Sequence, residues 1–547
     1  MTARAIISRR AFVGASAASG AALLTGGWGG LLSASRAAAR PLPGGDAAWI
    51  NATIPQLQAI MGSGQLTSRE LTLGYLARIR DLNPLLHAVI ETNPQAVAIA
   101  ARLDNERRSG RLRGPLHGIP VIVKDNIATG DTMQTTAGSL ALVNSRTPGD
   151  APLVQQLRAA GAVILGKANL SEWANFRGFS YNGWSGRGGF TRCPYVLSND
   201  PLGSSSGSAV APVTNLCSVA VGTETDGSIV APANNNHAFG LKPTVGLVAG
   251  PGIIPIAHSQ DTAGPMARSV TDAAFLLGAL KEGFGDYSGA LTRGALEGAR
   301  IGVDWKYFLD PFWGFPPAYP IMQQALDAME SLGATLIEVD TDPSFLLGPD
   351  ELTVLLYEFK VQIAEYLATL GHTDMRTLAD LIAFNIDHCW EEMKYFGQEI
   401  FEWAEETSGD LSDPIYTAAR AACIQSSREY GIDAALNSTT PPLDVLVAPT
   451  WSWLFSIAAV AGYPSESLPV GFFDDGSPVG FCMVSTAWQE AKLLAYAYDL
   501  EQELNAWAPP QYLGAVPHEP PDAGICEGKP KMHGRPGRIG WNSRRVF

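Results

Sequence analysis

Two clusters of glycine and serine, joined by a short apolar segment, constrain this chain more than any other feature of its sequence. The first cluster begins at Gly203 and the second ends at Ser228. Residues 216–221 between them have the length and the β-branched content of a buried strand. The sequence therefore predicts one strand with a serine near each end.

The downstream serine lies where an oxyanion could be bound. A hydroxyl that follows a strand and a glycine-containing turn lies among backbone N–H groups that a following helix leaves unpaired. The N–H groups of Thr225, Asp226, Gly227 and Ser228 could hold the negative oxygen of a tetrahedral intermediate while the Ser228 hydroxyl attacks the carbonyl carbon. An ordinary serine at a helix N-terminus gives the same pattern, so this motif alone decides nothing.

Further motifs follow one another in a fixed order along the chain. They are GIPVIVKDN at residues 118–126, GSSSGS at 203–208, GTETDGS at 222–228, GLKPT at 240–244, SQDTAGPM at 259–266 and AGYP at 461–464. In these motifs and their order the chain resembles the amidase signature family, over residues 53–505. The resemblance implies an α/β fold, with a single large domain and a mixed central sheet covered by helices on both sides. It also implies a hydrolase that uses neither a cofactor nor a metal.

The resemblance assigns three catalytic residues. The family's nucleophile falls on Ser228, the serine that follows a cis peptide bond falls on Ser204, and the base falls on Lys124. A serine hydroxyl is a poor nucleophile until a base takes its proton, and a lysine is such a base only if burial lowers its pKa. The resemblance thus implies that Ser204 relays a proton from Ser228 to Lys124. An amide would be hydrolysed to an acid and ammonia through an acyl-enzyme.

The composition excludes several classes of function. The chain has 547 residues, 46% of them hydrophobic, and a formal net charge of -15, so it lacks the basic surface that nucleic acids require. Its six cysteines show no CxxC spacing, and no disulfide scaffold is expected. Its eight histidines are scattered, so no metal site is expected. A small-molecule or peptide amide is the expected partner, and the sequence leaves the oligomeric state open.

The two ends of the chain differ from its middle. A twin-arginine motif before an alanine- and glycine-rich stretch predicts an export signal over residues 1–39, and thus a periplasmic or extracellular location. A mitochondrial transit peptide is the alternative. Residues 45–115 are expected to form an N-terminal helical part, residues 116–510 the catalytic domain, and residues 511–547 a flexible tail. No later apolar run is long enough for a stable membrane span.

Aromatic residues are expected to line the substrate pocket. The residues expected to bind the substrate are Trp173, Asn175, Phe176, Trp184 and Tyr463. Residues 182–189 resemble the peptide-amidase branch of the family, which removes the C-terminal amide of peptides. Two features depart from that branch or from the wider family. His237 stands where the family has a glycine, and the loop over residues 450–458 is shorter than in peptide-amidase relatives.

Several elements can be placed from local patterns. Residues 67–70 (Thr-Ser-Arg-Glu) indicate a capped helix start. Residues 350–409 are mostly helical in pattern and poor in motifs, which is typical of a lid or of an insertion that shapes a pocket. Residues 470–473 and 479–484 predict a hairpin, and residues 489–504 an amphipathic helix.

Three other interpretations are open at this point. Residues 203–207 match the G-x-S-x-G motif of α/β-hydrolases, which would make Ser205 the nucleophile, but the polar, proline-containing residues before it form a poor strand. An exported small-molecule binding protein, or a catalytically altered amidase homologue, would not need Lys124 and both serines. The third is the glutaminase subunit of an amidotransferase, and the export signal argues against it.

Overall fold

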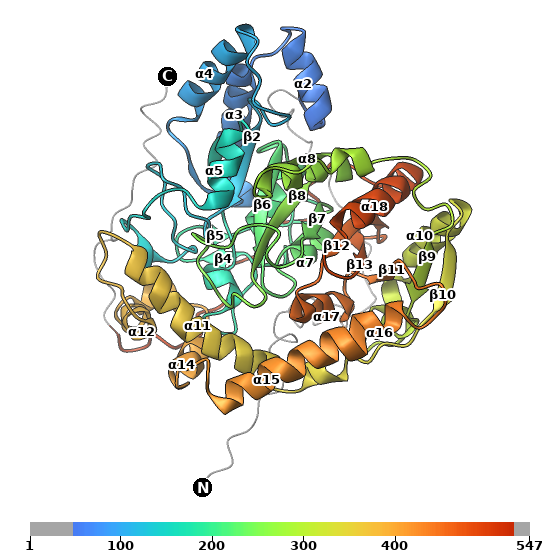
Figure 1. Cartoon of the computed structure of the whole chain (residues 1–547). Coiled ribbons are helices and arrows are strands. Elements are labelled where there is room, and N and C mark those ends of the chain that lie inside the picture. Colours follow the sequence, from blue (N-terminus) through green and yellow to red (C-terminus); the bar gives the residue numbers. More distant parts are fainter. Residues whose placement is uncertain (1–46, 530–547) are drawn as a thin grey trace, which may run out of the picture.

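An 11-stranded sheet forms the centre of the computed structural model, which describes residues 47–529 (Figure 1). Its strands are β1 (Val89–Thr92), β2 (Pro120–Lys124), β3 (Val163–Ala168), β6 (Val219–Glu224), β7 (Phe239–Lys242), β8 (Thr262–Ala267), β9 (Arg300–Val303), β10 (Thr335–Glu338), β11 (Val445–Pro449), β12 (Ser465–Phe472) and β13 (Pro478–Val484). They lie in the order β1-β3-β2-β6-β8-β7-β12-β13-β11-β9-β10, and a separate small ribbon pairs β4 (Trp184–Ser185) with β5 (Gly189–Phe190).

Parallel and antiparallel pairs both occur in the large sheet. β2 runs parallel to β3 and to β6, whereas β8 is antiparallel to both β6 and β7. β12 and β13 form the predicted hairpin, with Ser465 opposite Val484. The predicted α/β fold with a mixed central sheet is therefore confirmed.

Helices flank this sheet. They are α2 (Ile54–Gly62), α3 (Ser68–Leu86), α4 (Ala96–Arg108), α5 (Pro152–Ala159), α6 (Ser206–Val213), α7 (Val230–Asn235), α8 (Val270–Leu280), α9 (Lys306–Leu309), α10 (Tyr319–Ser331), α11 (Asp350–Thr369), α12 (Leu378–Asp387), α13 (Cys389–Glu392), α14 (Glu399–Glu405), α15 (Pro414–Ile424), α16 (Asp433–Leu436), α17 (Leu454–Ala461) and α18 (Glu490–Leu504). Short turns η1 (Leu140–Leu142), η2 (Glu172–Asn175), η3 (Ser288–Ala290), η4 (Pro316–Ala318) and η5 (Ser344–Leu347) and the π-helical η6 (Gln425–Ile432) join them.

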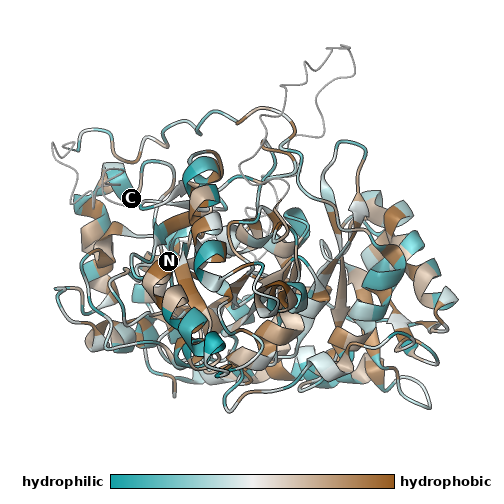
Figure 2. Cartoon of the chain, turned by 90° about the horizontal axis from the view of Figure 1, so that it is seen from above, coloured by the Kyte–Doolittle hydropathy of each residue, from teal (hydrophilic) through white to brown (hydrophobic). Residues whose placement is uncertain are grey.

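The helices are arranged by the chain segment from which they come. In Figure 1 the blue helices α2, α3 and α4 lie at one end of the molecule, and the yellow and orange helices α11, α12, α14 and α15 lie along the opposite side. In Figure 2 the strands are largely brown, whereas the outer helices carry teal residues as well. This distribution is expected when helices cover a buried sheet with their apolar sides. None of the helices within residues 47–529 combines the length and the apolar character needed to cross a bilayer.

In the N-terminal part, one element follows from a local sequence pattern and another does not. The Glu70 N–H donates to the Thr67 hydroxyl at 3.1 Å, and the Thr67 N–H donates to the Glu70 carboxylate at 2.9 Å. This reciprocal cap starts α3 as predicted. The expectation of a helical part overlooked β1, because this strand of four residues is defined by its antiparallel pairing with β3 and not by a local pattern.

The motif-poor segment is helical, as predicted, and it builds a second apolar core. Its helices α11, α12 and α14 bury Phe359, Leu381 and Phe401. The ring of Phe359 stacks on Phe401 at 5.2 Å and meets Phe176 edge-on at 5.1 Å. The segment thus covers the aromatic stretch that follows β3.

The C-terminal segment is docked as far as Lys529, although the sequence predicts a flexible tail. The Tyr512 N–H donates to the Pro194 carbonyl at 3.0 Å, and the Leu197 N–H donates to the Leu513 carbonyl at 2.8 Å. Backbone hydrogen bonds of this kind hold a polar segment that lacks an apolar periodicity of its own. The remainder of the predicted tail and the predicted export signal lie outside the described residues.

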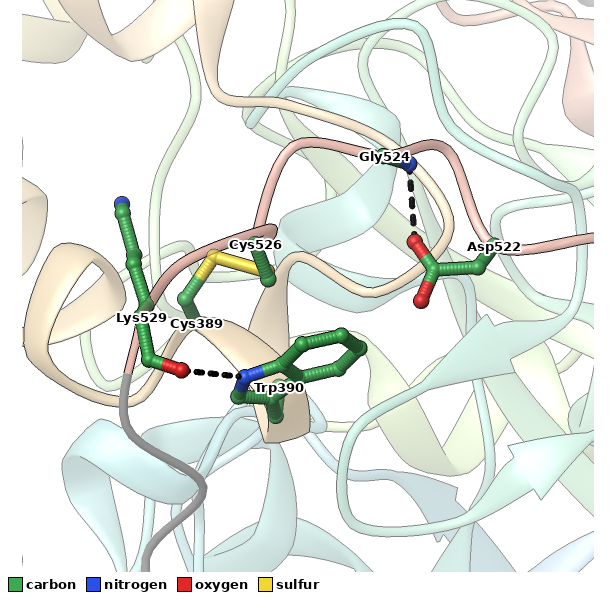
Figure 3. The surroundings of a disulfide bond; sticks show 6 residues. All are labelled: Cys389, Trp390, Asp522, Gly524, Cys526 and Lys529. Carbon is green, nitrogen blue, oxygen red and sulfur yellow. Dashed lines mark hydrogen bonds between the residues drawn. A yellow bond between two sulfur atoms is a disulfide. The ribbon is translucent and has the colours of Figure 1, made fainter.

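A disulfide fixes the end of this docked segment. It joins Cys389 at the start of α13 to Cys526, and beside it Trp390 Nε1 donates to the Lys529 carbonyl at 3.1 Å (Figure 3). The two cysteines are 137 residues apart and belong to no motif, so their pairing could not be predicted from spacing.

Candidate active site

Two parallel strands carry the polar residues of the site to one edge of the sheet. Lys124 is the last residue of β2, and Ser228 follows the end of β6 by one turn. The two strands are neighbours, with Val123 opposite Val221. Because the carboxyl ends of parallel strands lie at the same edge, the two motifs come together there.

Lys124 is buried and faces three oxygen atoms. Its ammonium nitrogen lies 2.7 Å from Ser204 Oγ, 2.9 Å from Thr223 Oγ1 and 3.2 Å from the Thr223 carbonyl oxygen. Burial lowers the pKa of Lys124 to about 7, although the negative charges of Glu224 and Asp261 act in the opposite direction. At neutral pH a substantial fraction of this lysine is therefore a neutral amine, which can accept a proton.

The Gly203–Ser204 peptide bond is cis, as the resemblance implies. The Ser171 N–H donates to the Ser204 carbonyl at 3.0 Å, which fixes the backbone of the serine that contacts Lys124. The next residue, Ser205, uses its hydroxyl elsewhere. It donates to the Thr223 carbonyl at 2.9 Å and accepts from the Thr223 N–H at 3.2 Å, so Ser205 supports the end of β6.

The loop that carries Ser228 is held from behind by Glu224. The Glu224 carboxylate accepts from the N–H groups of Ile229 at 2.6 Å and Val230 at 3.0 Å. Burial raises the pKa of Glu224, although Lys242 and these N–H groups act in the opposite direction. The loop before α7 is thus fixed on its far side, and Thr225, Asp226, Gly227 and Ser228 stay the predicted oxyanion site.

Ser228 is close to the Ser204 segment and is also the more accessible serine. The Ser205 N–H donates to the Ser228 carbonyl at 3.2 Å, which places the two loops side by side. Ser228 is 8% exposed, whereas Ser204 is fully buried. Ser228 thus keeps some exposed surface, whereas Ser204, which contacts Lys124, keeps none.

A second set of contacts ties the loop to the helical segment. The Thr225 hydroxyl donates to Asp261 at 2.5 Å, and Gln260 Nε2 donates to the Thr225 carbonyl at 3.3 Å and to Glu351 on α11 at 3.0 Å. Burial raises the pKa of Asp261 to about 6. Gln260 and Asp261 belong to the SQDTAGPM motif. This motif therefore shapes the loop over residues 225–228, which we call the nucleophile loop after the predicted role of Ser228.

Sequence reasoning missed the roles of Thr223 and Glu224. Both lie at the end of buried β6, and successive side chains of a strand point to opposite faces. Thr223 accordingly contacts Lys124, whereas Glu224 contacts the start of α7. Two polar residues in a row at the end of an apolar strand were the available signal.

The five residues expected to bind substrate lie in different surroundings. Trp173 and Phe176 are each 2% exposed, and Trp184 is 4% exposed, within clusters of other rings. The Tyr463 hydroxyl donates to Asp433 at 3.0 Å. Asn175 lies near the Ser204 segment, because its Oδ1 would be 3.3 Å from a Cβ added to Gly203. The packing of these four rings favours a structural role, and their contact with substrate stays a prediction.

The unusual residues after Ser228 are structural. His237 has a φ of 50°, is fully buried, and lies 4.1 Å from the Phe472 ring, centroid to centroid. Burial lowers the pKa of His237 to about 4. Asn235 Nδ2 donates to the Asp200 carbonyl at 2.8 Å, which braces the segment before Ser204. His237 therefore packs in the core against Phe472 and takes no part in the site.

Nothing in residues 47–529 gathers three or more His, Cys, Asp or Glu side chains in a way that could hold a metal ion. The chemistry available at this edge of the sheet is that of a buried amine, two hydroxyl groups and a loop of backbone N–H groups. Such a set is suited to acyl transfer through a serine.

Comparisons with known proteins agree with this chemistry. Residues 70–455 match the family model described as Amidase. The native peptide amidase of Stenotrophomonas maltophilia is 48% identical, with a TM-score of 0.80, and the match covers 86% of this chain and 100% of that one. An amidase family protein of Bacillus anthracis is 34% identical, with a TM-score of 0.78 and coverage of 84% and 92%. A glutamyl-tRNA(Gln) amidotransferase subunit of Halorhodospira halophila is 33% identical over 483 residues, or 82% of this chain and 96% of that protein. The chain therefore belongs to the amidase signature family and is an amide-hydrolysing enzyme.

Proposed function

We propose that this enzyme removes the C-terminal amide of peptides, and hydrolyses related carboxylic amides, with release of ammonia. The similarity to a peptide amidase at 48% identity supports this substrate class more strongly than the 33% identity to an amidotransferase subunit supports a glutaminase role. The observation that carries the proposal is the buried Lys124, 2.7 Å from Ser204 and one loop away from Ser228.

In the first half of the proposed reaction, Ser228 attacks the amide carbonyl. The Ser228 hydroxyl passes its proton to Ser204, and Ser204 passes its own proton to the neutral amine of Lys124. Ser228 Oγ forms a bond to the carbonyl carbon, and the negative oxygen is held by N–H groups of the nucleophile loop. The proton then returns along the same path to the leaving nitrogen, the C–N bond breaks, and ammonia leaves an acyl ester on Ser228.

In the second half, water takes the place of the serine hydroxyl. The relay removes a proton from the water as its oxygen attacks the ester carbonyl, and the proton returns to Ser228 Oγ as the ester bond breaks. The products are a carboxylic acid and the original enzyme. Lys124 is neutral at the start and at the end, so one base serves both halves of the cycle.

An amidated peptide tests this substrate class directly. Mass spectrometry after incubation should show replacement of the terminal –NH2 by –OH, while the internal peptide bonds stay intact. The Ser228→Ala variant is the control and should leave the peptide unchanged. Internal fragments without loss of the terminal amide would contradict the proposal and indicate an endopeptidase.

We also propose that the chain is exported through the twin-arginine route. The Cys389–Cys526 disulfide supports this location, because disulfides persist in oxidising compartments outside the cytoplasm. Replacement of Arg9 and Arg10 by Lys should retain the protein in the cytoplasm, as measured by cell fractionation. Export that is unchanged in this variant would contradict the twin-arginine assignment.

A further inference from the structure

A second group of aromatic side chains lies beside the nucleophile loop. It comes from the loop before η4, from the loop that leads into α17 and from the first turn of α17, and we call it the aromatic shelf. Its members are Phe312, Trp313, Phe315, Trp451, Trp453 and Phe455. The ring centroids of Trp313 and Trp453 are 6.0 Å apart, as are those of Phe315 and Trp451. Ring contacts thus join the two loops, and Phe455 follows Trp453 by two residues in the first turn of α17.

Two hydrogen bonds from Trp453, one from its side chain and one from its backbone, fix the two loops of the shelf to each other. Trp453 Nε1 donates to the Phe312 carbonyl at 3.1 Å, and the Trp453 N–H donates to the Trp313 carbonyl at 3.3 Å. Because indole rings lose little conformational entropy on binding, rings held in this way form a preorganised apolar surface.

One end of the shelf touches the residues immediately before Ser228. A Cβ placed on Gly227 would lie 2.7 Å from Phe455 Cε2, so the Phe455 ring lies directly against the nucleophile loop. The next residue, Ser456, donates its hydroxyl to Asp226 Oδ1 at 2.9 Å. Any acyl group bound to Ser228 therefore has this ring as a near neighbour.

The rings of the shelf are more exposed than the aromatic residues that the sequence analysis expected to bind the substrate. Five of its members, including Trp451 and Phe455, are half-buried, and Phe312 is 37% exposed. By contrast, Trp173 and Phe176 are only 2% exposed. A group of partly exposed aromatic rings next to a nucleophile is typical of a surface that binds an apolar ligand.

We propose that the aromatic shelf determines the acyl specificity of the enzyme, by binding the apolar or aromatic side chains of a peptide amide next to the bond that is cleaved. This inference rests on the proposed function. The leaving group is ammonia, which is too small to contribute contact area, so discrimination between substrates must come from the acyl part. The shelf faces the side chain of the last residue, and Phe455 is its ring nearest the nucleophile loop.

The test compares two dipeptide amides that differ only in their last residue, phenylalanine or glycine. In the wild-type enzyme, kcat/KM should be higher for the phenylalanine amide. Phe455→Ala should lower the ratio of the two kcat/KM values about 10-fold, the effect of roughly 60 Å² of apolar surface losing its partner. Phe284→Ala, which removes a phenylalanine ring that is 45% exposed outside the shelf, is the matched control and should leave the ratio unchanged.

A second variant and a binding measurement keep the outcome clear. Trp451→Ala should lower the same ratio. In the Ser228→Ala background, calorimetry should show that Phe455→Ala weakens binding of the phenylalanine amide by a similar factor. If the wild-type enzyme cleaves both amides and neither shelf variant alters the ratio or the affinity, the shelf only stabilises its loops and the inference is wrong. If the wild-type enzyme cleaves neither amide, it is the proposed function that fails.

Discussion

At the scale of single residues, the charge state of Lys124 limits the reaction in the proposed mechanism. Only its neutral form can take the proton that Ser204 relays, and burial lowers its pKa to about 7. As the pH rises through this value, the neutral fraction grows and kcat/KM should rise with it to a plateau. A pH profile of the wild-type enzyme measures this dependence.

Replacement of Lys124 tests its proposed role as the base through the loss of kcat/KM. Lys124→Ala should lower kcat/KM at least ~100-fold, as expected when a general base is removed, in a protein that remains folded by circular dichroism. Lys167 provides a matched control, because it is also buried, but it donates to the Ile127 carbonyl at 2.5 Å and to Thr135 at 2.9 Å. Lys167→Met should keep the wild-type midpoint of the pH profile. A Lys124→Ala enzyme with near-normal activity would remove the lysine from the mechanism.

Glu224 holds the loop that carries Ser228, the proposed nucleophile. Its carboxylate fixes the N–H groups of Ile229 and Val230, the two residues after Ser228. Glu224→Ala should lower kcat about 10-fold or more with little change in KM, since a hydrogen bond to a charged group stabilises the loop by about 1.5–3 kcal/mol. Glu224→Gln should recover part of the loss because its amide oxygen still accepts. An unchanged kcat in a folded Glu224→Ala enzyme would show that the loop keeps its conformation without the Glu224 carboxylate.

At the scale of elements, the disulfide joins the docked C-terminal segment to α13. The same helix carries Glu392, whose carboxylate accepts from the Leu140 N–H at 2.7 Å, so α13 contacts the loop after β2 as well as the tail. Cys526→Ser should lower Tm by a few degrees, since loss of a native disulfide costs about 2–5 kcal/mol.

Chemical reduction supplies the control for this prediction. A reducing agent should lower the Tm of the wild-type protein to that of Cys526→Ser and leave the variant unaffected, as measured by calorimetry. Equal Tm values for the oxidised wild-type protein and the variant would mean that the hydrogen bonds of the segment hold it without the disulfide.

Elements with a strong local pattern could be predicted, and those defined by distant partners could not. The cap at Thr67 and the β12–β13 hairpin follow from neighbouring residues, and both are present. The strand β1 and the docking of residues 511–529 depend on β3 and on residues 194–197, which local patterns do not include. The prediction of a flexible tail was therefore based on composition where tertiary contacts decide the outcome.

At the scale of the whole molecule, the site is assembled from segments that only the fold brings together. Lys124 and Ser204 are 80 residues apart in the chain, and Lys124 and Thr223 are 99 apart. Spacing alone gives no such contacts, and it was the resemblance to a family that named the three catalytic candidates. Their chemistry could then be argued from burial and hydrogen bonding.

It was harder to predict which aromatic residues near the site stay accessible, because composition does not show which of them are covered. Trp173 and Phe176 precede a segment whose helices α11 and α14 cover them with Phe359 and Phe401. Phe455 stays accessible because it lies in the first turn of α17, against Gly227. The distinction between the two groups of rings depends on how layers of the fold pack.

The most direct test of the proposed mechanism is to identify the residue that carries the acyl group. The enzyme is mixed with an ester or amide substrate, quenched in acid during turnover, digested, and analysed by mass spectrometry. The proposed mechanism predicts an acyl adduct on the peptide that contains Ser228, and no adduct in the Ser228→Ala variant. An adduct on Ser205, or full turnover by the Ser228→Ala variant, would contradict it.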